Sequence, residues 1–294
     1  ETVFMLQPLI EGVFRGMKLF KLIGILQTST AVIFVIAIGS GAYLYGIDGA
    51  VTGLLTYYFF YALISIWICF KKLPVKNILG NLSIEKLKSQ SAILWVMILP
   101  VFVLSFVEAP INWWAQVLMA KYDTIGAVGS MSAILQIRNL LIIIPNYFFS
   151  TFTTFQATLN AQDNQSKYFM NLRKVFWTSL ILGILSTAIL SLFGSQLLGL
   201  YGNEYKADLN GFYVAMVSFP FMMTVSLLRS NLLIKEHQRL MLVTSIIASF
   251  IQIGLMYWLL PVGVNPVMAY FWGQLGYYFV MFATFGICTI QDSL

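Results

Sequence analysis

The chain has 294 residues, of which 59% are hydrophobic and only 10% are charged, and its formal net charge is +6. An ordinary soluble domain is about 25% charged, so this composition excludes a soluble enzyme or binding domain and indicates a polytopic helical membrane protein. In such a protein the positive charge belongs in cytoplasmic loops beside anionic lipid headgroups, and we expect no nucleic-acid partner.

Eight apolar segments follow one another along the chain, each long enough to cross a hydrocarbon core about 30 Å thick. They are expected at residues 22–45, 50–70, 92–119, 125–157, 175–200, 212–234, 240–262 and 265–288. Stretches such as Ala31–Ile38 are apolar on every face, whereas a barrel strand would alternate. The expected fold is therefore an all-α polytopic membrane protein with eight transmembrane helices.

The basic residues between these segments are sorted by side. Two of them, Lys121 and Lys206, lie in one alternate set of gaps, and thirteen lie in the other set. The set of thirteen consists of Arg15, Lys18, Lys21, Lys71, Lys72, Lys76, Lys86, Lys88, Lys167, Arg173, Lys174, Lys235 and Arg239. The positive-inside rule places the richer set in the cytoplasm, which predicts a cytoplasmic C-terminus.

The first two segments are expected to form a hairpin. Segment 22–45 ends at the turn Tyr45–Gly49, and segment 50–70 returns. Gly49 and Gly53 have the small-xxx-small spacing that lets two helices approach closely.

Three parts are expected in the chain. Residues 1–70 are the end of an N-terminal helix bundle, with two transmembrane helices. Residues 71–91 carry five lysines and form a cytoplasmic linker, in which Ser83 is suited to cap a short helix. Residues 92–294 form a C-terminal six-helix bundle.

Several of the expected helices contain proline, namely at Pro100, Pro110, Pro145 and Pro220. Proline removes a backbone donor and usually bends a helix. Bends are therefore expected at these points.

Arg138 lies about 13 residues into its segment, near the middle of the membrane. A charge at this depth costs at least about 2.5–3.5 kcal/mol on insertion scales, so Arg138 should face a watery cavity or a partner. Two interpretations stay open: Arg138 binds an anionic substrate, or it pairs with Glu108 as a structural bridge.

Two further charges lie within apolar segments. Glu108 is expected in the outer part of the membrane. It is a proton or sodium site, a counter-charge that lines the cavity, or a carboxylate that reaches the interface beside Trp113. Arg229 lies close to the inner boundary, where it either reaches the headgroups or binds a phosphate at the inner mouth of a cavity.

Amides and indoles complete the candidate substrate cavity. We expect Gln136, Asn139 and Asn112 to hydrogen-bond a hydroxyl-rich cargo, and Trp113 to stack on sugar faces. The alternatives are hydrogen bonds between helices for the amides and an interfacial anchor for the indole.

Signatures of enzymatic chemistry are missing from the sequence. It contains no phosphate-binding loop for ATP, no metal-binding cluster of His, Cys and carboxylates, and no nucleophile with its base. His237, the single histidine, is interpreted as a solvated loop residue. We therefore expect no catalytic residue, no metal and no cofactor, and a transporter instead of an enzyme.

Several stretches resemble one transporter family. The sequence Glu-Gly-Val-Phe-Arg-Gly-Met-Lys-Leu-Phe at residues 11–20 is similar to the inner end of the fourth helix in polysaccharide flippases of the O-antigen type. Further similar stretches are Pro110–Trp114, Tyr122–Val128, Leu198–Tyr205, Asn231–Arg239 and Leu259–Gly263. These flippases share a superfamily with multidrug and toxic compound extrusion (MATE) transporters and with the lipid II flippase.

The resemblance implies a fold and a function. The family has about twelve helices in two bundles, so this chain would correspond to the fifth to twelfth and lack the first four. It would flip polyprenyl-pyrophosphate-linked oligosaccharide from the inner to the outer leaflet of a bacterial plasma membrane, for O-antigen, capsule or exopolysaccharide. Membrane lipids, a coupling cation (H⁺ or Na⁺) and the polysaccharide polymerase machinery are the other implied partners.

Two other functions stay open. A multidrug/cation antiporter of the same superfamily would need acidic cavity residues for cationic drugs. A membrane-embedded glycosyltransferase or ligase would need a sizeable outer loop with catalytic residues, whereas the longest expected outer loop, Tyr201–Gly211, is short.

Overall fold

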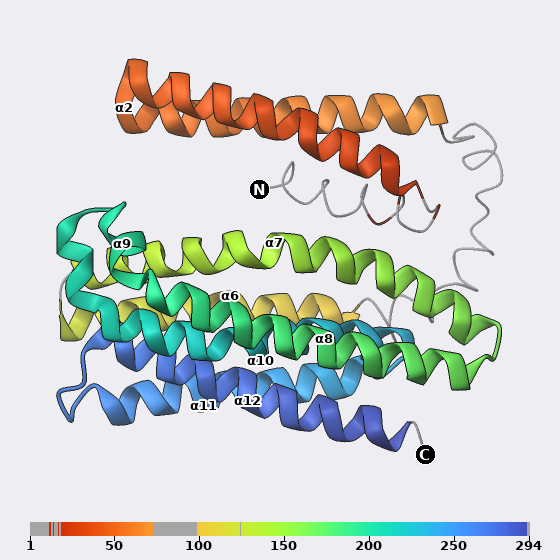
Figure 1. Cartoon of the computed structure of the whole chain (residues 1–294). Helices are drawn as coiled ribbons and strands as arrows, with labels where there is room; N and C mark the ends of the chain where they lie inside the picture. Colours follow the sequence, from red (N-terminus) through yellow and green to blue (C-terminus); the bar gives the residue numbers. More distant parts are fainter. Residues whose placement is uncertain are drawn as a thin grey trace. The chain divides into compact units, whose positions relative to one another are not determined.

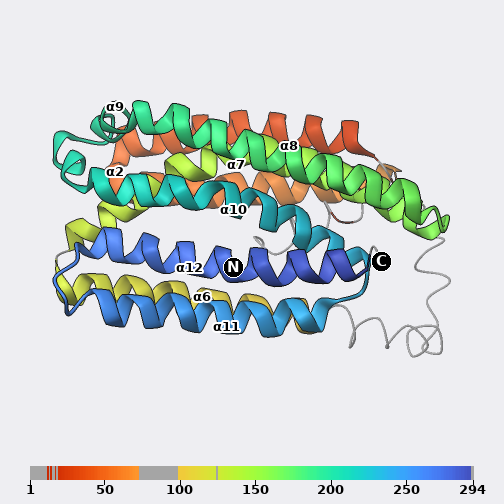
Figure 2. The same cartoon turned by 60° about the horizontal axis from the view of Figure 1, so that its bottom comes forward.

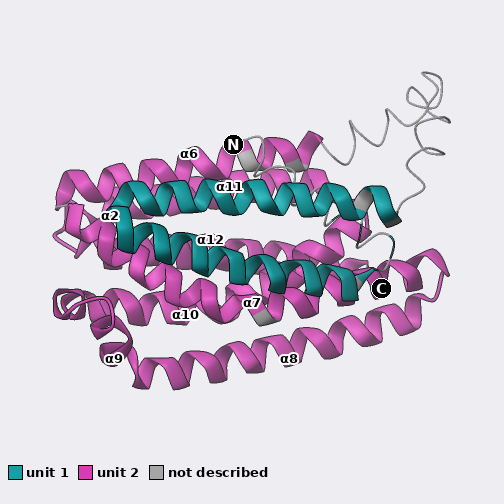
Figure 3. Ribbon diagram, turned by 90° about the horizontal axis from the view of Figure 1, so that it is seen from above, with its two compact units in different colours: residues 1–90 teal, residues 91–294 magenta. Residues whose placement is uncertain are grey.

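The computed structural model describes residues 12, 14, 17, 19–72, 99–123 and 125–292, and every element in this part of the chain is a helix (Figure 1). The elements are α2 (Phe20–Lys72), α6 (Leu99–Tyr122), α7 (Ile125–Ala161), α8 (Gln165–Leu192), α9 (Gly194–Gly199), the 3₁₀ helix η2 (Asn203–Asp208), α10 (Leu209–Ile234), α11 (Gln238–Leu259) and α12 (Pro266–Gln291). They belong to two compact units, residues 1–90 and 91–294, coloured separately in Figure 3. Most of the expected linker, its short helix at Ser83 and the first residues of segment 92–119 lie outside the described residues.

In unit 1, α2 is a helical hairpin. Its helical geometry is interrupted at Gly46, where φ is 62° and ψ is −137°, a conformation that glycine adopts readily. The two halves touch through small residues: a Cβ atom at Gly49 would overlap the carbonyl oxygen of Gly41, and one at Gly53 would overlap that of Ala37. The expected turn and the close approach at Gly49 and Gly53 are therefore confirmed.

Six helical stretches in the described part of the chain are long and apolar enough to cross a membrane, which makes the protein a multi-pass membrane protein. They are Lys21–Ile68, Ile125–Ile143, Gln165–Leu192, Asn203–Ile234, Gln238–Leu259 and Pro266–Gln291. The first of them contains the Gly46 turn, and α6 is not among them.

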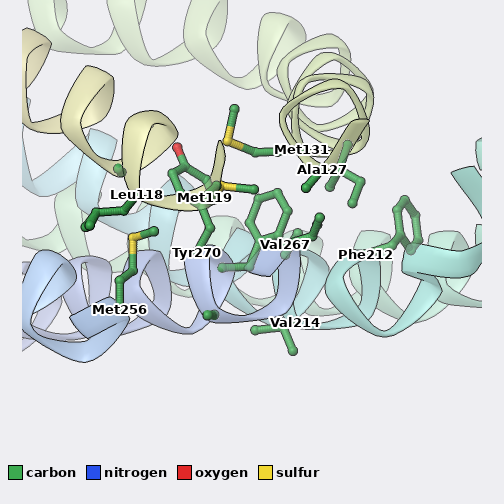
Figure 4. Packing of buried hydrophobic residues seen from close by; sticks show 14 of the residues in the cluster. Leu118, Met119, Ala127, Met131, Phe212, Val214, Met256, Val267 and Tyr270 are labelled. Atoms are coloured by element: carbon green, nitrogen blue, oxygen red, sulfur yellow. The ribbon is translucent and has the colours of Figure 1, made fainter. Parts of the chain in front are cut away.

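In unit 2, α10 and α12 form the centre of a helix bundle. Helix α10 packs against α12, α8 and α7, and α12 also packs against α11, which in turn contacts α6 (Figure 2). Most of α10 is buried, as expected for a helix that is apolar on all sides. Figure 4 shows the core near the start of α10, where Met119, Met131, Phe212 and Tyr270 are all buried.

Helices α8 and α10 meet at Pro220. The helix continues through this proline, although a proline at this point leaves the carbonyl oxygen of Met216 without its intrahelical donor. The hydroxyl of Thr187 in α8 donates to that oxygen at 2.8 Å. Gly183 lets the backbones approach, because a Cβ atom there would lie 2.7 Å from the Cα of Pro220.

Candidate functional site

The most deeply buried charge of unit 2 is Arg138 on α7, whose side chain is 3% exposed. Its Nη1 donates to Oε1 of Gln274 at 2.6 Å and to Oγ of Ser218 at 3.3 Å. The guanidinium carbon also lies 5.9 Å from the ring centre of Phe271 and 5.8 Å from that of Tyr278. All of these partners are neutral, so the charge of Arg138 is solvated by dipoles and aromatic faces without an ion pair to any described carboxylate.

The second arginine of the interior has an acidic partner. Nη2 of Arg229 on α10 donates to Oε1 of Glu108 on α6 at 2.7 Å. The hydroxyl of Tyr277 on α12 donates to the same carboxylate oxygen at 2.9 Å. Glu108 therefore pairs with Arg229, and the expected alternative of a bridge between Arg138 and Glu108 is wrong.

This contact also corrects the expected depths. Counting along the chain places Glu108 in the outer part of the membrane and Arg229 near the inner boundary, yet their side chains meet. Tyr277, which binds Glu108, is near the middle of α12. Residue counts locate Cα atoms along an ideal helix, whereas a long arginine side chain ends several ångströms away from its own Cα.

A cavity of about 150 Å³ lies beside this ion pair. Four helices line it, each with residues three or four positions apart that share one helix face. The polar lining residues are Glu108 and Asn112 of α6, Arg229 of α10, Ser249 and Gln252 of α11, and Gln274, Tyr277 and Tyr278 of α12. Since pockets for drug-sized ligands measure about 300–1,000 Å³, this cavity has room for several water molecules or a phosphate-sized group.

Unpaired hydrogen-bond donors lie in the cavity lining and close to it. Buried nitrogens of Arg138 (Nε), Arg229 (Nε) and Gln252 (Nε2) have no hydrogen-bond partner among the described residues. Two guanidinium groups and one carboxylate give this interior a formal charge of about +1. An arrangement of this kind is suited to an anion or to a ligand rich in oxygen acceptors.

One amide connects Arg138 to the cavity that Arg229 lines. Gln274 lines the cavity and accepts the hydrogen bond of Arg138, while its own Nε2 donates to the hydroxyl of Tyr270 at 2.8 Å. A ligand in the cavity that reoriented Gln274 would therefore change the solvation of Arg138 directly.

The other expected cavity residues lie elsewhere. Arg138 is buried but does not line the cavity. Gln136, Asn139 and Trp113 are exposed and do not line it either, and Gln136 accepts a hydrogen bond from Tyr201 at 3.3 Å. Asn112 is exposed but does line the cavity.

Two tyrosines of the site were not expected from the sequence. Tyr277 and Tyr278 follow Gln274 by three and four positions, so they share its face of α12. A composition count treats tyrosine as hydrophobic, which conceals its hydroxyl. The sequence feature that indicates them is the grouping of three side chains with polar ends, Gln274, Tyr277 and Tyr278, on one face of an otherwise apolar helix.

A second titratable cluster lies where α10 and α12 end. Nε2 of His237 is 3.2 Å from Oδ1 of Asp292, and the ligand atoms of His237, Asp292 and Cys288 lie within 4.8 Å of one another. His237 lies in the loop between α10 and α11 and its side chain is 38% exposed, as expected for a solvated loop residue, but its contact with Asp292 was not expected. The set contains ligand types that a transition metal accepts, but a hydrogen bond alone accounts for the contact between His237 and Asp292.

Comparison with family models, with curated proteins and with solved structures gave no match for this chain.

Proposed function

We propose that the chain belongs to a transporter that moves polyprenyl-pyrophosphate-linked oligosaccharide from the inner to the outer leaflet of a bacterial plasma membrane. Eight long helices would cross the membrane, namely the two halves of α2 together with α6, α7, α8, α10, α11 and α12. They would correspond to the fifth to twelfth helices of a two-bundle MATE-like transporter, with the C-terminus in the cytoplasm.

One observation carries the proposal: Arg138 is buried in unit 2 with neutral partners only. Its position along the expected span would place it near the middle of the membrane. Burying an unpaired guanidinium in hydrocarbon is costly, and a structural role would be served better by a carboxylate partner. An anionic cargo would offset this free-energy cost by electrostatic attraction when its phosphate groups come close to Arg138. The unpaired donors of Arg229 and Gln252 in the nearby cavity suit the same ligand.

The pair of Glu108 and Arg229 supplies a second element of the mechanism. An arriving phosphate would compete with Glu108 for Arg229, because both bind guanidinium as charge-assisted acceptors. Glu108 released in this way is an acceptor for a proton or a sodium ion, which would link cargo binding to a cation gradient. Nearby amides of Asn112, Gln252 and Gln274 would contact sugar hydroxyls.

The antiporter alternative is less well supported. It requires a carboxylate that is available to a cationic drug, and the one carboxylate of the described cavity, Glu108, is occupied by Arg229 and Tyr277.

The test is to delete the gene in its own bacterium and to restore the full-length gene with Arg138→Ala, Arg138→Lys or Arg239→Ala. Arg239, an exposed arginine at the end of the bundle, is the matched control. We expect Arg138→Ala to lower surface polysaccharide at least tenfold at equal membrane abundance, Arg138→Lys to retain part of it, and Arg239→Ala to resemble the wild type. Undiminished polysaccharide in Arg138→Ala would refute the role of Arg138, and loss of drug resistance in its place would favour the antiporter.

A further inference from the structure

A groove of about 900 Å³ lies between α8 and α12, at the end of unit 2 where α8 begins and α12 ends. Its walls include Phe176 and Trp177 of α8 and Ile290 of α12, and Leu228 of α10, 1% exposed, forms its floor. Its lining is mainly apolar. It is about six times larger than the cavity beside Glu108.

The middle of the groove is not filled by the protein's own side chains. A Cβ atom added at Gly286 would have no neighbour within 4 Å, although Gly286 lies within α12. Trp177 is 52% exposed and Ile290 is 62% exposed. In a multi-pass membrane protein, an apolar groove at a helix end is in contact with lipid chains.

Two cations lie at the rim of this groove. Arg173 and Lys174 both line it and are exposed, and within the described part of the chain neither side chain has a hydrogen-bond or ion-pair partner. Lys235, at the same end of the bundle, differs because it donates to Asn160 and Gln165 at 3.0 and 2.8 Å. Arg173 and Lys174 are therefore available for a ligand outside the protein.

We propose that the groove between α8 and α12 binds an anionic glycerophospholipid, with its phosphate held by Arg173 and Lys174 and an acyl chain lying over Gly286. Apolar volume and adjacent unpaired cations match the two chemically different parts of such a lipid. Trp177 adds an indole of the kind enriched at the level of the headgroups. The proposal depends on the membrane location of the helices and is independent of flippase function.

The first experiment measures contact between the lipid and Trp177. In the full-length protein every tryptophan except Trp177 is replaced by phenylalanine, and the protein is reconstituted with phosphatidylglycerol or phosphatidylcholine brominated on the acyl chains. We expect phosphatidylglycerol to quench Trp177 at a mole fraction up to about 25-fold lower than phosphatidylcholine does. Each cation near an anionic surface contributes about a fivefold preference, so Arg173→Gln with Lys174→Gln should remove most of it.

Matched controls separate the groove from the rest of the surface. Lys121→Gln with Lys206→Gln removes two cations at the opposite end of unit 2 and should leave the preference unchanged. Gly286→Phe should fill the groove and reduce quenching by both lipids. Gly254→Phe, at a glycine of α11 that is also open around its Cβ position, should not reduce it.

Each result has a defined meaning. Equal quenching by the two lipids, or a preference that survives neutralisation of Arg173 and Lys174, overturns the assignment of the phosphate. Quenching unaffected by Gly286→Phe overturns the position of the chain, and displacement by polyprenyl phosphate but not by diacyl lipid overturns the choice of occupant. If the variant with a single tryptophan does not fold, native mass spectrometry of the wild type and the two double variants gives the same comparison.

Discussion

The ion pair between Glu108 and Arg229 should couple α6 to α10 by a measurable free energy. Their charged atoms are 2.7 Å apart, and their side chains are 31% and 33% exposed, respectively. Exposed pairs contribute up to about 1 kcal/mol, whereas removing one partner of a fully buried pair costs about 3–5 kcal/mol. A pair that is one-third exposed lies between these limits, so we expect Glu108→Gln to destabilise the protein by about 2 kcal/mol.

The coupling is isolated by a double-mutant cycle. Thermal unfolding in detergent is measured for the wild type, Glu108→Gln, Arg229→Gln and the double variant, with the exposed loop variant Glu204→Gln as control. For a unit of this size about 2 kcal/mol corresponds to a fall in Tm of about 4–8 °C. We expect each single variant to show this fall and the double variant to fall much less than their sum, because it leaves no uncompensated charge.

Additive effects would refute the reasoning. If the two single losses sum to the double loss within about 0.5 kcal/mol, the residues act independently, and Glu108 and Arg229 do not form a stabilising pair in the folded protein. Glu204→Gln should leave Tm unchanged, which shows that the loss of one carboxylate elsewhere is not enough.

Two further predictions concern the bundle and its orientation. Thr187→Val should lower the free energy of unfolding by about 1 kcal/mol, because it leaves the carbonyl oxygen of Met216 without a donor. In a Pro220→Ala background the same change should cost almost nothing, because the N–H of the alanine replaces the hydroxyl of Thr187. Equal falls in Tm in both backgrounds would contradict this. A cysteine at Lys206, in a protein without other cysteines, should react with an impermeant maleimide in intact cells, and one at Lys86 only after permeabilisation; the reverse pattern would invert the expected topology.

The hairpin of α2 could be predicted from sequence because its signals are local. A glycine in a short polar turn and glycines spaced along the following helix are sufficient to indicate a tight return. The structure places the interruption at Gly46 and the contacts at Gly41, Gly49 and Gly53. The long apolar helices were equally accessible, because an apolar run is visible without knowledge of its neighbours.

The charged contacts could not be predicted, because the choice of partner depends on how helices are placed beside one another. Glu108 was available to either arginine on sequence grounds, and only the packing of α6 and α10 beside α12 brings Arg229 to it. Which side chains of α7 are exposed could not be predicted either. Gln136 and Asn139 flank the buried Ile137 and Arg138, and which of these neighbours faces the bundle depends on the rotation of α7.

Helix α12 decides how the two arginines differ. Gln274 offers Arg138 a neutral oxygen, and Tyr277, three positions further along the same face, offers its hydroxyl to the carboxylate of Glu108 that neutralises Arg229. One arginine is therefore left with its full charge, whereas the other is neutralised by a partner that an anion can displace. A phosphate in the cavity would meet Arg229 in the lining and gain it only by releasing Glu108, whereas Arg138 is in contact with the cavity only through Gln274. Under the proposed function, the release of Glu108 would therefore depend on the arrival of the anion, so cation uptake would follow cargo binding.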